Sequence, residues 1–529
     1  MVFASNPVTS NPVTSNLAIL NLGIAFQEIA RRYENRTALI YPATGEQITY
    51  GKLNLLVERI AGVLWAKGLR RGDVAALFHD KSPAAFAAML ACLRLGIIYT
   101  NLDPDCPWER QRKILGACRP GIIINAFQEM PCAIDLEAEG FRDILHLRDI
   151  QALTGNEPLP DCRAIDAGSQ AYIMFTSGST GMPKGALISH ANLLWFIAWA
   201  RERFAITPAD VLTNVNPIYF DNAVFDFYLA IFSGAALVPV TPDQVRDTRL
   251  LVRLINGAGC TIWFSVPSLL VYLLTTRALS ATDFPAIRKI IFGGEGFPKT
   301  KLSQLYAMFG IRAELENVYG PTECTCICSA HTIGADDFQD MQSLAPLGKL
   351  AQNFDFEILP LDEKAADFGE LFLLGPQVGL GYYNDPERTA KAFIQNPRHA
   401  LYPNIGYRTG DLVRRDARGW LHFKGRADFQ IKHMGYRIEL EEVEAALNTL
   451  PEVKECAVIY RKHGEGLGQI LAFAATNSPA PSEELLNKIT AIVPSYMVPR
   501  RITVMDFLPK NANGKIDRPA LHALVTEAC

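Results

Sequence analysis

The chain has 529 residues, of which 49% are hydrophobic, and its formal net charge is −4. This length exceeds what one hydrophobic core usually supports, and the composition excludes disorder over most of the chain, so we expect two or more folded units. The near balance of 51 basic and 55 acidic residues gives no electrostatic reason to expect a nucleic acid or an anionic membrane as a partner.

Targeting signals and cysteine usage indicate the cellular compartment in which the protein is expected. No apolar run is long enough to span a bilayer, and the first basic residue is Arg31, so neither a membrane span nor a secretory signal is expected. Eleven cysteines without framework spacing predict reduced thiols and a cytoplasmic location. Cys324, Cys326 and Cys328 alternate, which predicts one face of a strand, but no zinc-like pair accompanies them and a metal there is disfavoured.

The order of apolar runs predicts the fold class. Residues 5–9 and 10–14 repeat Ser-Asn-Pro-Val-Thr with nothing to bury, which predicts a disordered tail over 1–15. From residue 16 to about 400, strand-like runs alternate with amphipathic helices, for example 74–78 before 84–95 and 289–292 before 299–309. This alternation predicts an α/β architecture with largely parallel sheets, whose ligands bind beyond the carboxyl ends of the strands.

A donor-rich loop follows one such strand. Residues 171–175 are apolar, and 176–185 read Thr-Ser-Gly-Ser-Thr-Gly-Met-Pro-Lys-Gly. Glycines let backbone N–H groups approach a phosphate, and hydroxyls and an ammonium add charge-assisted bonds. A flexible linker is the alternative, and the Walker A spacing is absent. The candidate phosphate-binding residues are Thr176, Ser177, Gly178, Ser179, Thr180, Gly181 and Lys184.

The sequence pattern changes near residue 425, which indicates the start of a second unit. A Gly-Tyr-Arg-Ile-Glu string at 435–439 precedes a predicted helix at 440–450 and a predicted strand at 457–460. We therefore predict a large unit over 16–427, a boundary at Asp428 and a small unit over 428–529. His190, directly after the loop, is interpreted as a helix-start packing residue, because no Gly-x-Ser-x-Gly signature supports a catalytic histidine.

Further strings appear in a recognisable order. They are Tyr-Gly-Pro-Thr-Glu at 319–323, Gly-Glu-Leu at 369–371 with Gly-Leu-Gly-Tyr at 379–382, Tyr-Arg-Thr-Gly-Asp at 407–411 and Asn-Gly-Lys-Ile-Asp-Arg at 513–518. Together with the loop at 176–185, they resemble the adenylate-forming superfamily of acyl-CoA synthetases, luciferases and nonribosomal peptide synthetase adenylation domains. The resemblance implies a large N-terminal domain of mostly parallel sheets flanked by helices, and a small, mobile α+β C-terminal lid.

The resemblance also implies roles for residues of this chain, with ATP and Mg²⁺ as cofactors. Tyr319 would stack on adenine, Asn317 would bond its edge, Asp411 would bind the ribose, and Arg426 would contact ribose or phosphate. Gly294, Glu295, Val318 and Gly320 complete this nucleotide set. Glu323 would hold Mg²⁺. Asp428 would be the hinge, and the residues expected to act on the reacting groups are Thr176, Lys184, Thr322, Glu323 and Lys515.

The motif at 220–226, Phe-Asp-Asn-Ala-Val-Phe-Asp, resembles members that activate amino acids. There an Asp, here Asp221, binds the substrate's ammonium group; a turn residue before a helix is the alternative. By motif offset, the acid pocket comprises Asp221, Asn222, Phe225, Phe264, Ile291, Gly293, Val318, Cys326 and Ile327. Phe225 stands at a position where members of this family commonly have Trp. Phe225 and Phe264, with mostly apolar neighbours, predict a small or compact substrate such as Ala or Pro.

The expected reaction converts an amino acid and ATP to an aminoacyl adenylate and pyrophosphate. The aminoacyl group then passes to the phosphopantetheine thiol of a separate carrier protein, as in nonribosomal peptide biosynthesis and secondary metabolism. The substrate carboxylate is already ionised, so the site must supply alignment and charge neutralisation rather than a base. Two alternatives remain: an acyl-CoA ligase in which Asp221 is structural, and a catalytically inactive nucleotide-binding protein, which the complete set of expected residues disfavours.

Overall fold

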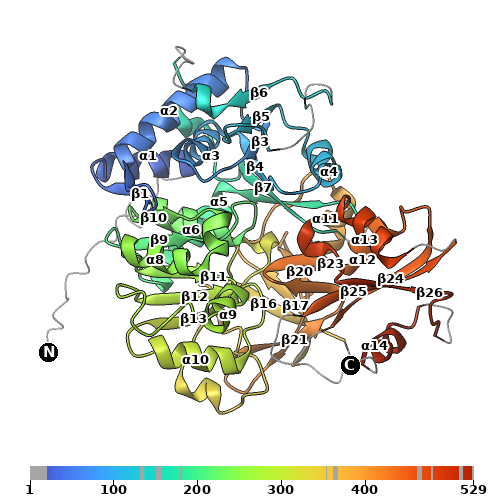
Figure 1. Cartoon of the computed structure of the whole chain (residues 1–529). Coiled ribbons are helices and arrows are strands. Elements are labelled where there is room, and N and C mark those ends of the chain that lie inside the picture. The colour runs from blue at the N-terminus through green and yellow to red at the C-terminus, as the bar shows by residue number, and fades with distance from the viewer. Residues whose placement is uncertain are drawn as a thin grey trace.

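The computed structural model describes residues 21–131, 136, 139–150, 158–178, 181–352, 354–361, 367–461, 468–477, 481–511 and 516–526. The predicted tail over 1–15 and the expected site residues Ser179, Thr180 and Lys515 lie outside the described residues. Two large sheets, a smaller antiparallel sheet and a C-terminal unit make up the molecule (Figure 1). No described helix combines the length and the apolar character that crossing a bilayer requires.

The largest sheet has nine strands. In spatial order they are β15 (Lys349–Leu350), β14 (Ser329–Thr332), β13 (Glu314–Tyr319), β12 (Lys289–Gly293), β11 (Ile262–Ser265), β9 (Val211–Asn214), β10 (Ala236–Pro239), β1 (Thr37–Tyr41) and β2 (Glu46–Thr49). The strands from β13 to β1 run parallel, whereas β14, β15 and β2 join at the two ends as antiparallel strands. The carboxyl ends of β12 and β13 therefore share one edge, where the predicted nucleotide motifs lie.

The second sheet has seven strands, in the order β18 (Gly381–Tyr382), β8 (Lys184–Ser189), β7 (Gln170–Thr176), β4 (Ile98–Leu102), β3 (Val74–Phe78), β5 (Ile122–Asn125) and β6 (Ile144–His146). The strands from β7 to β6 are parallel. β7 and β8 form an antiparallel pair with Thr176 opposite Lys184, so the donor-rich loop connects two adjacent strands. The prediction of mostly parallel sheets is confirmed for both.

Helices pack on both sheets. They are α1 (Leu22–Arg32), α2 (Tyr50–Ala66), α3 (Pro83–Leu95), α4 (Trp108–Cys118), α5 (His190–Arg203), α6 (Asn222–Phe232), α7 (Pro242–Arg246), α8 (Thr248–Ala258), α9 (Pro267–Thr275) and α10 (Lys299–Phe309). Short 3₁₀ turns occur at η1 (Leu147–Asp149), η2 (Cys162–Ala164), η3 (Thr322–Cys324), η4 (Ala335–Phe338) and η5 (Ser495–Met497).

One hydrophobic core joins the two large sheets through α3 and α6. Ser82 caps α3, Gly96 ends it in a left-handed conformation, and every residue from Ala85 to Leu95 is buried. Phe86 of α3 stacks on Phe227 of α6, with ring centroids 5.4 Å apart. The adjacent Tyr228 hydroxyl lies 2.7 Å from that of Tyr99 on β4, so α6 connects the nine-stranded sheet to the seven-stranded one.

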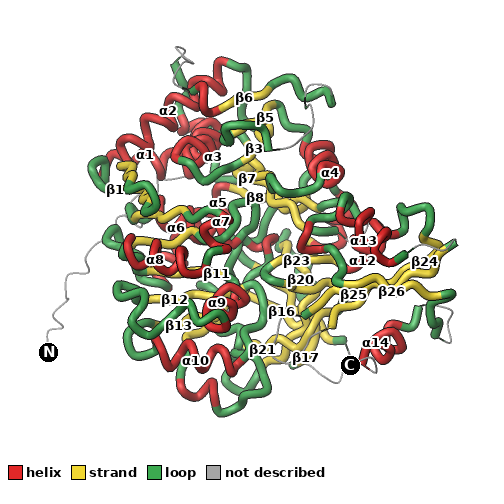
Figure 2. Tube along the Cα trace, viewed as in Figure 1, coloured by secondary structure: helices red, strands yellow, loops and turns green. Residues whose placement is uncertain are grey.

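The third sheet is antiparallel, which the sequence analysis did not predict. It contains β16 (Asp355–Pro360), β17 (Phe368–Leu374), β20 (Ile405–Arg415) and β19 (Phe393–Gln395), with β21 (Leu421–Arg426) also paired to β20. The short helix α11 (Pro386–Ala392) lies between β18 and β19 in the chain. The strands are seen beside the C-terminal elements in Figure 2.

The C-terminal part has its own α+β core. A hairpin of β22 (Gln430–His433) and β23 (Tyr436–Glu439) leads into α12 (Leu440–Leu447). The remaining elements are β24 (Val453–Arg461), β25 (Gln469–Thr476), α13 (Ser482–Thr490), β26 (Arg501–Met505) and α14 (Arg518–Thr526). The helix expected at 440–450 ends three residues earlier, and the strand expected at 457–460 is part of a longer one.

His190 is fully buried at the first position of α5. Its Nδ1 accepts a hydrogen bond from the Leu22 backbone N–H at 3.0 Å, which ties α1 to α5. Burial lowers the pKa of His190 to about 4. The fold therefore requires the neutral imidazole.

This requirement predicts a loss of stability in acid. The pKa of His190 is lower in the folded state than in the unfolded state. The contribution of the neutral imidazole to the free energy of unfolding is therefore complete above about pH 6.5 and is lost as the pH falls toward 4. Between pH 7 and pH 4, the free energy of unfolding of the wild type should fall by roughly 3 kcal/mol more than that of His190→Asn. Chemical denaturation at several pH values measures this difference; parallel pH profiles for the two proteins would contradict it.

Candidate functional site

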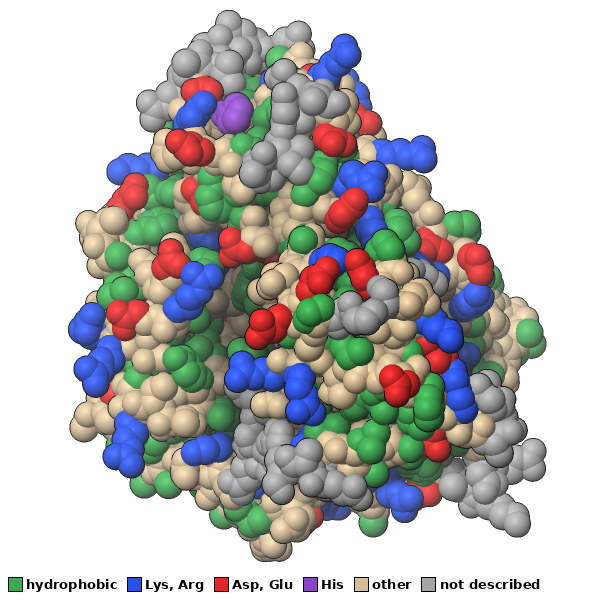
Figure 3. Space-filling view, turned by 45° about the vertical axis from the view of Figure 1, so that its right-hand side comes forward, with side chains coloured by type: hydrophobic (Ala, Val, Ile, Leu, Met, Phe, Trp, Pro, Cys, Tyr) green, Lys and Arg blue, Asp and Glu red, His purple; other side chains and the backbone are tan. Residues whose placement is uncertain are grey.

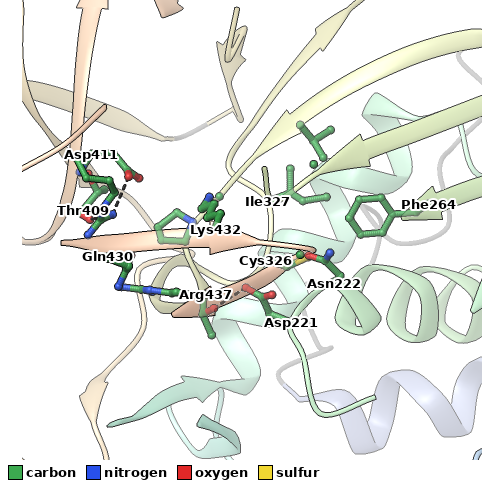
Figure 4. A pocket seen from close by; sticks show the side chains of 18 residues that line it. Asp221, Asn222, Phe264, Cys326, Ile327, Thr409, Asp411, Gln430, Lys432 and Arg437 are labelled. Carbon is green, nitrogen blue, oxygen red and sulfur yellow. Dashed lines mark hydrogen bonds and ion pairs between the residues drawn. The ribbon is translucent and has the colours of Figure 1, made fainter. Parts of the chain in front are cut away.

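Two adjoining cavities lie where the large sheets, the antiparallel sheet and the β22–β23 hairpin meet, and Figure 4 shows the first of them. Their volumes are about 50 and about 60 Å³, and both are lined by Gly294, Val318 and Lys432. Gly294 follows β12, Val318 is on β13 and Lys432 is on β22. The cavities thus lie beyond the carboxyl ends of β12 and β13, as predicted for an α/β fold.

The second cavity is a mostly apolar slot that matches the expected adenine site. It is lined by Gly294, Glu295, Gly296, Phe297, Asn317, Val318, Tyr319, Leu344, Ala345, Leu347, Phe423 and Lys432. The Asn317 side-chain amide donates to the Pro346 carbonyl at 2.8 Å, so its Oδ1 is left as an acceptor. An acceptor in an apolar slot fits the exocyclic amine of adenine.

Asp411 and Arg426, the expected ribose residues, both line the first cavity and contact each other. Asp411 Oδ1 lies 2.7 Å from the Arg426 guanidinium, and its Oδ2 accepts from the Tyr319 hydroxyl at 2.5 Å. Gly410 has φ +70°, and a Cβ there would come within 2.6 Å of Arg426. The motifs at 319–323 and 407–411 are far apart in the sequence, and the buried Asp411 carboxylate therefore joins them.

The first cavity brings together most of the predicted acid pocket. Its lining residues include Asp221, Asn222, Phe264, Gly293, Val318, Cys326 and Ile327. The Thr322 hydroxyl donates to Asp221 Oδ2 at 2.6 Å, and burial raises the pKa of Asp221. Figure 4 shows Asp221, Asn222 and Cys326 grouped at the opposite end from Asp411.

Two predicted pocket residues do not line the cavity. Phe225 is fully buried between Phe264 and Phe204, with ring centroids 4.7 and 5.4 Å away. Ile291 lies in the same core on β12. Both residues therefore support the wall of the cavity from behind, whereas Phe264 forms its surface.

The three alternating cysteines do not form a strand, so that prediction is wrong. Cys324 ends the 3₁₀ turn η3, and Thr325 and Cys326 adopt left-handed conformations with φ of 59° and 73°. The local hydrogen bonds of the turn place Cys326 on the cavity while Cys324 packs in the core around the antiparallel sheet. All three thiols are buried and free.

Glu323 is buried in η3 and stays ionised. Its Oε1 accepts from the Tyr382 hydroxyl at 2.7 Å, and its Oε2 lies 2.7 Å from the Arg437 guanidinium. Burial favours the protonated form, but Arg437 and Lys184 outweigh it and lower the pKa of Glu323 to about 2. A buried anionic carboxylate beside the phosphate loop fits a hard cation such as Mg²⁺.

The described part of the phosphate loop contacts the C-terminal unit. Thr176 Oγ donates to the Lys184 carbonyl at 3.4 Å, and the Lys184 ammonium lies 3.3 Å from Glu439 and 4.0 Å from Glu323. Burial and Arg437 lower the pKa of Lys184. Gly178 and Lys184 line neither small cavity, but both line a separate, larger and open cavity of about 960 Å³.

Sequence reasoning left several residues out of the site, namely Thr409, Gln430, Arg437, Glu439 and Glu442. All except Thr409 lie on the β22–β23 hairpin and the start of α12. The tight turn at Gly435, with φ +83° and its N–H donating to Glu295 at 3.1 Å, inserts the hairpin against the cavity. The string at 435–439 could have indicated this.

Lys515 lies outside the described residues, and its described neighbours line neither small cavity. Lys510 and Ile516 form an isolated bridge, Ile516 packs against the C-terminal sheet, and Lys510 pairs with Glu455. The hairpin carrying Lys432 and Arg437 is therefore the part of the C-terminal unit that lines the first cavity, within the described ranges.

Comparisons with known proteins agree with the motifs. The sequence matches the AMP-binding enzyme family over residues 26–383 and the AMP-binding enzyme C-terminal domain over residues 442–515. It is 33% identical over 504 residues to an L-proline–L-prolyl-carrier protein ligase of Pseudomonas fluorescens, covering 93% of this chain and 96% of that protein. It is 32% identical to tyrocidine synthase 3 of Brevibacillus parabrevis, covering 94% of this chain but only 7% of that protein.

A solved structure supports the fold. A double mutant of the o-succinylbenzoate CoA synthetase of Bacillus subtilis superposes with a TM-score of 0.82 at 23% identity, covering 94% of this chain and 97% of that chain. At this identity the likeness shows the fold alone. The family match extends over well over half of the chain and includes both the phosphate loop and the Tyr-Gly-Pro-Thr-Glu motif. The chain therefore belongs to the AMP-binding enzymes of the adenylate-forming superfamily.

Proposed function

We propose that this protein activates a small or compact amino acid with ATP and loads it onto the phosphopantetheine thiol of a separate carrier protein. The observation that carries the proposal is the Asp221 carboxylate, which lines the first cavity beside Asn222, Phe264 and Cys326. An enclosed anion opposite a substrate ammonium strongly favours a zwitterion over a plain carboxylic acid.

The side chains of the predicted acid pocket support a compact substrate. Phe264, Cys326 and Ile327 line the first cavity together with Asp221. Asn222 adds one polar side chain to an otherwise apolar wall. Alanine and proline fit these features. The relative of matching length from Pseudomonas fluorescens is named for L-proline, which favours the same class of substrate.

The first step is an in-line substitution at the α-phosphorus of ATP. A substrate carboxylate oxygen forms the new P–O bond, and the bond to the bridging oxygen of pyrophosphate breaks. Asn317 and Tyr319 hold adenine, Asp411 and Arg426 position the ribose, and Ser177, Gly178 and Lys184 bind phosphate oxygens. Lys515 stabilises charge at the α-phosphate. Glu323 would hold Mg²⁺, which neutralises charge on the phosphates when it is bound.

The second step transfers the acyl group. The carrier's thiolate attacks the carbonyl carbon of the adenylate, the thioester C–S bond forms, and the C–O bond to AMP breaks. The position of Lys432, Gly435 and Arg437 at the cavity supports assigning the present arrangement to this step. Asp428 would be the hinge between units 16–427 and 428–529; its carboxylate holds Arg426 at 2.6 and 2.8 Å and accepts from the Gln430 N–H.

Amino-acid-dependent ATP–pyrophosphate exchange tests the proposal. The panel contains all proteinogenic amino acids, D-alanine, β-amino acids, and aryl and fatty acids, each with and without Mg²⁺. We expect one strong signal from a small amino acid, which would also identify the substrate. Exchange only with acids that lack an amino group would overturn the proposal and make Asp221 structural.

An acyl-CoA ligase is the second candidate, because an o-succinylbenzoate CoA synthetase shares the fold. Coenzyme A and a phosphopantetheinylated carrier protein can be compared as acceptors of the activated acid. Faster transfer to coenzyme A than to every carrier tested would favour this candidate.

A further inference from the structure

The wall of the first cavity contains a break in the pairing of the nine-stranded sheet. β9 and β11 are neighbours in that sheet, and among the described residues their register contains one pair, Ile262 with Leu212. A continued parallel ladder would pair Phe264 with Asn214 two residues further on. The main-chain pairing stops before that point, where Phe264 lines the cavity. The buried backbone N–H and carbonyl of Phe264 therefore need other partners.

Two side chains, from β9 and from the loop that follows it, replace the missing ladder bonds. The Phe264 N–H donates to Thr213 Oγ at 3.3 Å, and the Phe264 carbonyl accepts from Asn216 Nδ2 at 3.1 Å. The ring is fixed separately, because it packs on Phe225 of α6 with centroids 4.7 Å apart and points toward Ile327 (Figure 4). The backbone of this wall thus depends on two hydrogen bonds that a regular ladder would not need.

Asn216 is itself held by buried groups of opposite charge. Its Nδ2 also donates to Asp226 Oδ2 on α6 at 3.0 Å, and its carbonyl accepts from the Lys81 ammonium at 2.9 Å. Lys81 comes from the loop after β3 in the seven-stranded sheet, and its ammonium also donates to the carbonyls of Asn214 and Val240. All of these side chains except that of Val240 are polar, and all are buried. One buried amide therefore connects α6, β11 and the seven-stranded sheet beside the cavity wall.

Asn216 is placed to control the length of the acid pocket. Asp221, the proposed ammonium partner, lies at the start of α6, whereas Phe264 lies on β11, so the space between them depends on how α6 and β11 are joined. One link is the ring contact between Phe225 and Phe264. The other is the Asn216 amide, which bonds both Asp226 and Phe264. Without this amide the Phe264 carbonyl would lose its partner, and the wall would be free to move into the space left behind.

We propose that Asn216 is a positioning residue that fixes the Phe264 wall relative to α6 and thereby limits the length of the substrate side chain. The inference rests on the proposed function in one respect, that the first cavity binds the acid to be activated. It adds a residue that lies outside the cavity lining and acts on the substrate through Phe264.

Selectivity between homologues measures the position of this wall. Alanine and 2-aminobutyrate differ by one methylene, as do proline and piperidine-2-carboxylate, and a well-fitted apolar pocket discriminates such pairs by about 10- to 200-fold. In Asn216→Ala, the ratio of kcat/KM for the larger member to that for the smaller member should rise about 10-fold in ATP–pyrophosphate exchange, with the KM for ATP within about twofold of the wild type. The ratio is taken within one preparation, so a lower fraction of folded protein does not change it.

Asn214→Ala is the matched control. The Asn214 side chain donates to the same Asp226 oxygen at the same distance of 3.0 Å, and it is also buried, but it has no bond to Phe264 among the described contacts. Both variants should lose a similar amount of stability in chemical denaturation, whereas only Asn216→Ala should change the selectivity. An unchanged ratio in Asn216→Ala, or an equal shift in Asn214→Ala, would overturn the inference.

Thr213→Val decides the question if Asn216→Ala does not fold. This change keeps the shape of the side chain and removes the acceptor of the Phe264 N–H, so it loosens the same wall from its other backbone group. The homologue ratio should shift in the same direction by about threefold, as expected for the loss of one neutral hydrogen bond. In that case, a ratio equal to that of the wild type would contradict the inference.

Failure of this inference and failure of the proposed function give different results. A wild-type protein that activates amino acids, with the same homologue ratio in every variant, would keep the proposed function and lose the inference. A wild-type protein that activates only acids without an amino group would lose the proposed function. Propionate and butyrate, which also differ by one methylene, would then replace the amino-acid pairs, and a shift confined to Asn216→Ala and Thr213→Val would still support the positioning role.

Discussion

Replacing Lys515 with alanine is expected to lower amino-acid-dependent ATP–pyrophosphate exchange by about 100- to 1,000-fold, the usual effect of removing one charged group that stabilises a developing anion. Binding of ATP should persist, because adenine, ribose and the outer phosphates have other proposed partners. Exchange assays and nucleotide binding by calorimetry measure the two quantities separately.

The second step provides an internal control for this variant. Lys432 and Arg437, not the described neighbours of Lys515, line the cavity in the present arrangement. Supplied with preformed aminoacyl adenylate, Lys515→Ala should therefore load the carrier at close to the wild-type rate. Lys510→Ala, which removes a lysine paired with Glu455 on the C-terminal sheet, should leave both steps intact. Equal losses in both steps would contradict a role confined to adenylation.

Replacing Asp221 with asparagine should raise the KM for the amino acid at least about 30-fold. Loss of one member of an enclosed charged pair weakens the binding free energy of the substrate by about 2 kcal/mol or more. Each 1.4 kcal/mol corresponds to about a factor of ten in affinity. The asparagine keeps the shape, and its Oδ1 can still accept from Thr322, so the change isolates the charge. Steady-state kinetics with both substrates measure the effect, and the KM for ATP should stay within about twofold.

Deaminated substrates sharpen this test. The corresponding acid without its amino group leaves Asp221 unpaired in the wild type, so it should be used poorly. The variant should use that acid at least as well as the wild type does. A change confined to the ATP dependence, or no preference for the amino group in the wild type, would show that Asp221 is structural and favour the acyl-CoA ligase.

Most of the site could be predicted because each motif combines a strand with the turn that follows it. The pattern before Gly294 and around Tyr319 marks two neighbouring parallel strands, whose carboxyl ends must meet at one edge. The position of Phe225 could not be predicted in this way. The position of a residue in the α6 motif does not determine whether its ring points into a cavity or packs against a second ring. Here Phe264 lines the cavity, and Phe225 packs behind Phe264.

The antiparallel sheet and the contacts of the β22–β23 hairpin could not be predicted from local sequence pattern, because both depend on tertiary packing. Between residues 355 and 426 the structure has short strands and the short helix α11, so a local pattern of alternating runs was compatible with the α/β prediction, and only the strand pairing shows that the sheet is antiparallel. Glu439 and Glu442 read as ordinary surface carboxylates at the start of a helix, because acidic residues are common there. Only the packing of α12 against the phosphate loop shows that they are buried.

Helix α3 has a consequence for how this protein is made. Its residues from Ala85 to Leu95 are all buried, so it has no polar side to face water while it waits for a partner. That partner includes Phe227 of α6, which leaves the ribosome much later. Helices α1 and α2, which precede α3 in the chain, also pack on it, but the side of α3 that packs on α6 stays uncovered until α6 has been made. This exposed apolar surface favours aggregation during synthesis and makes dilute conditions important for refolding.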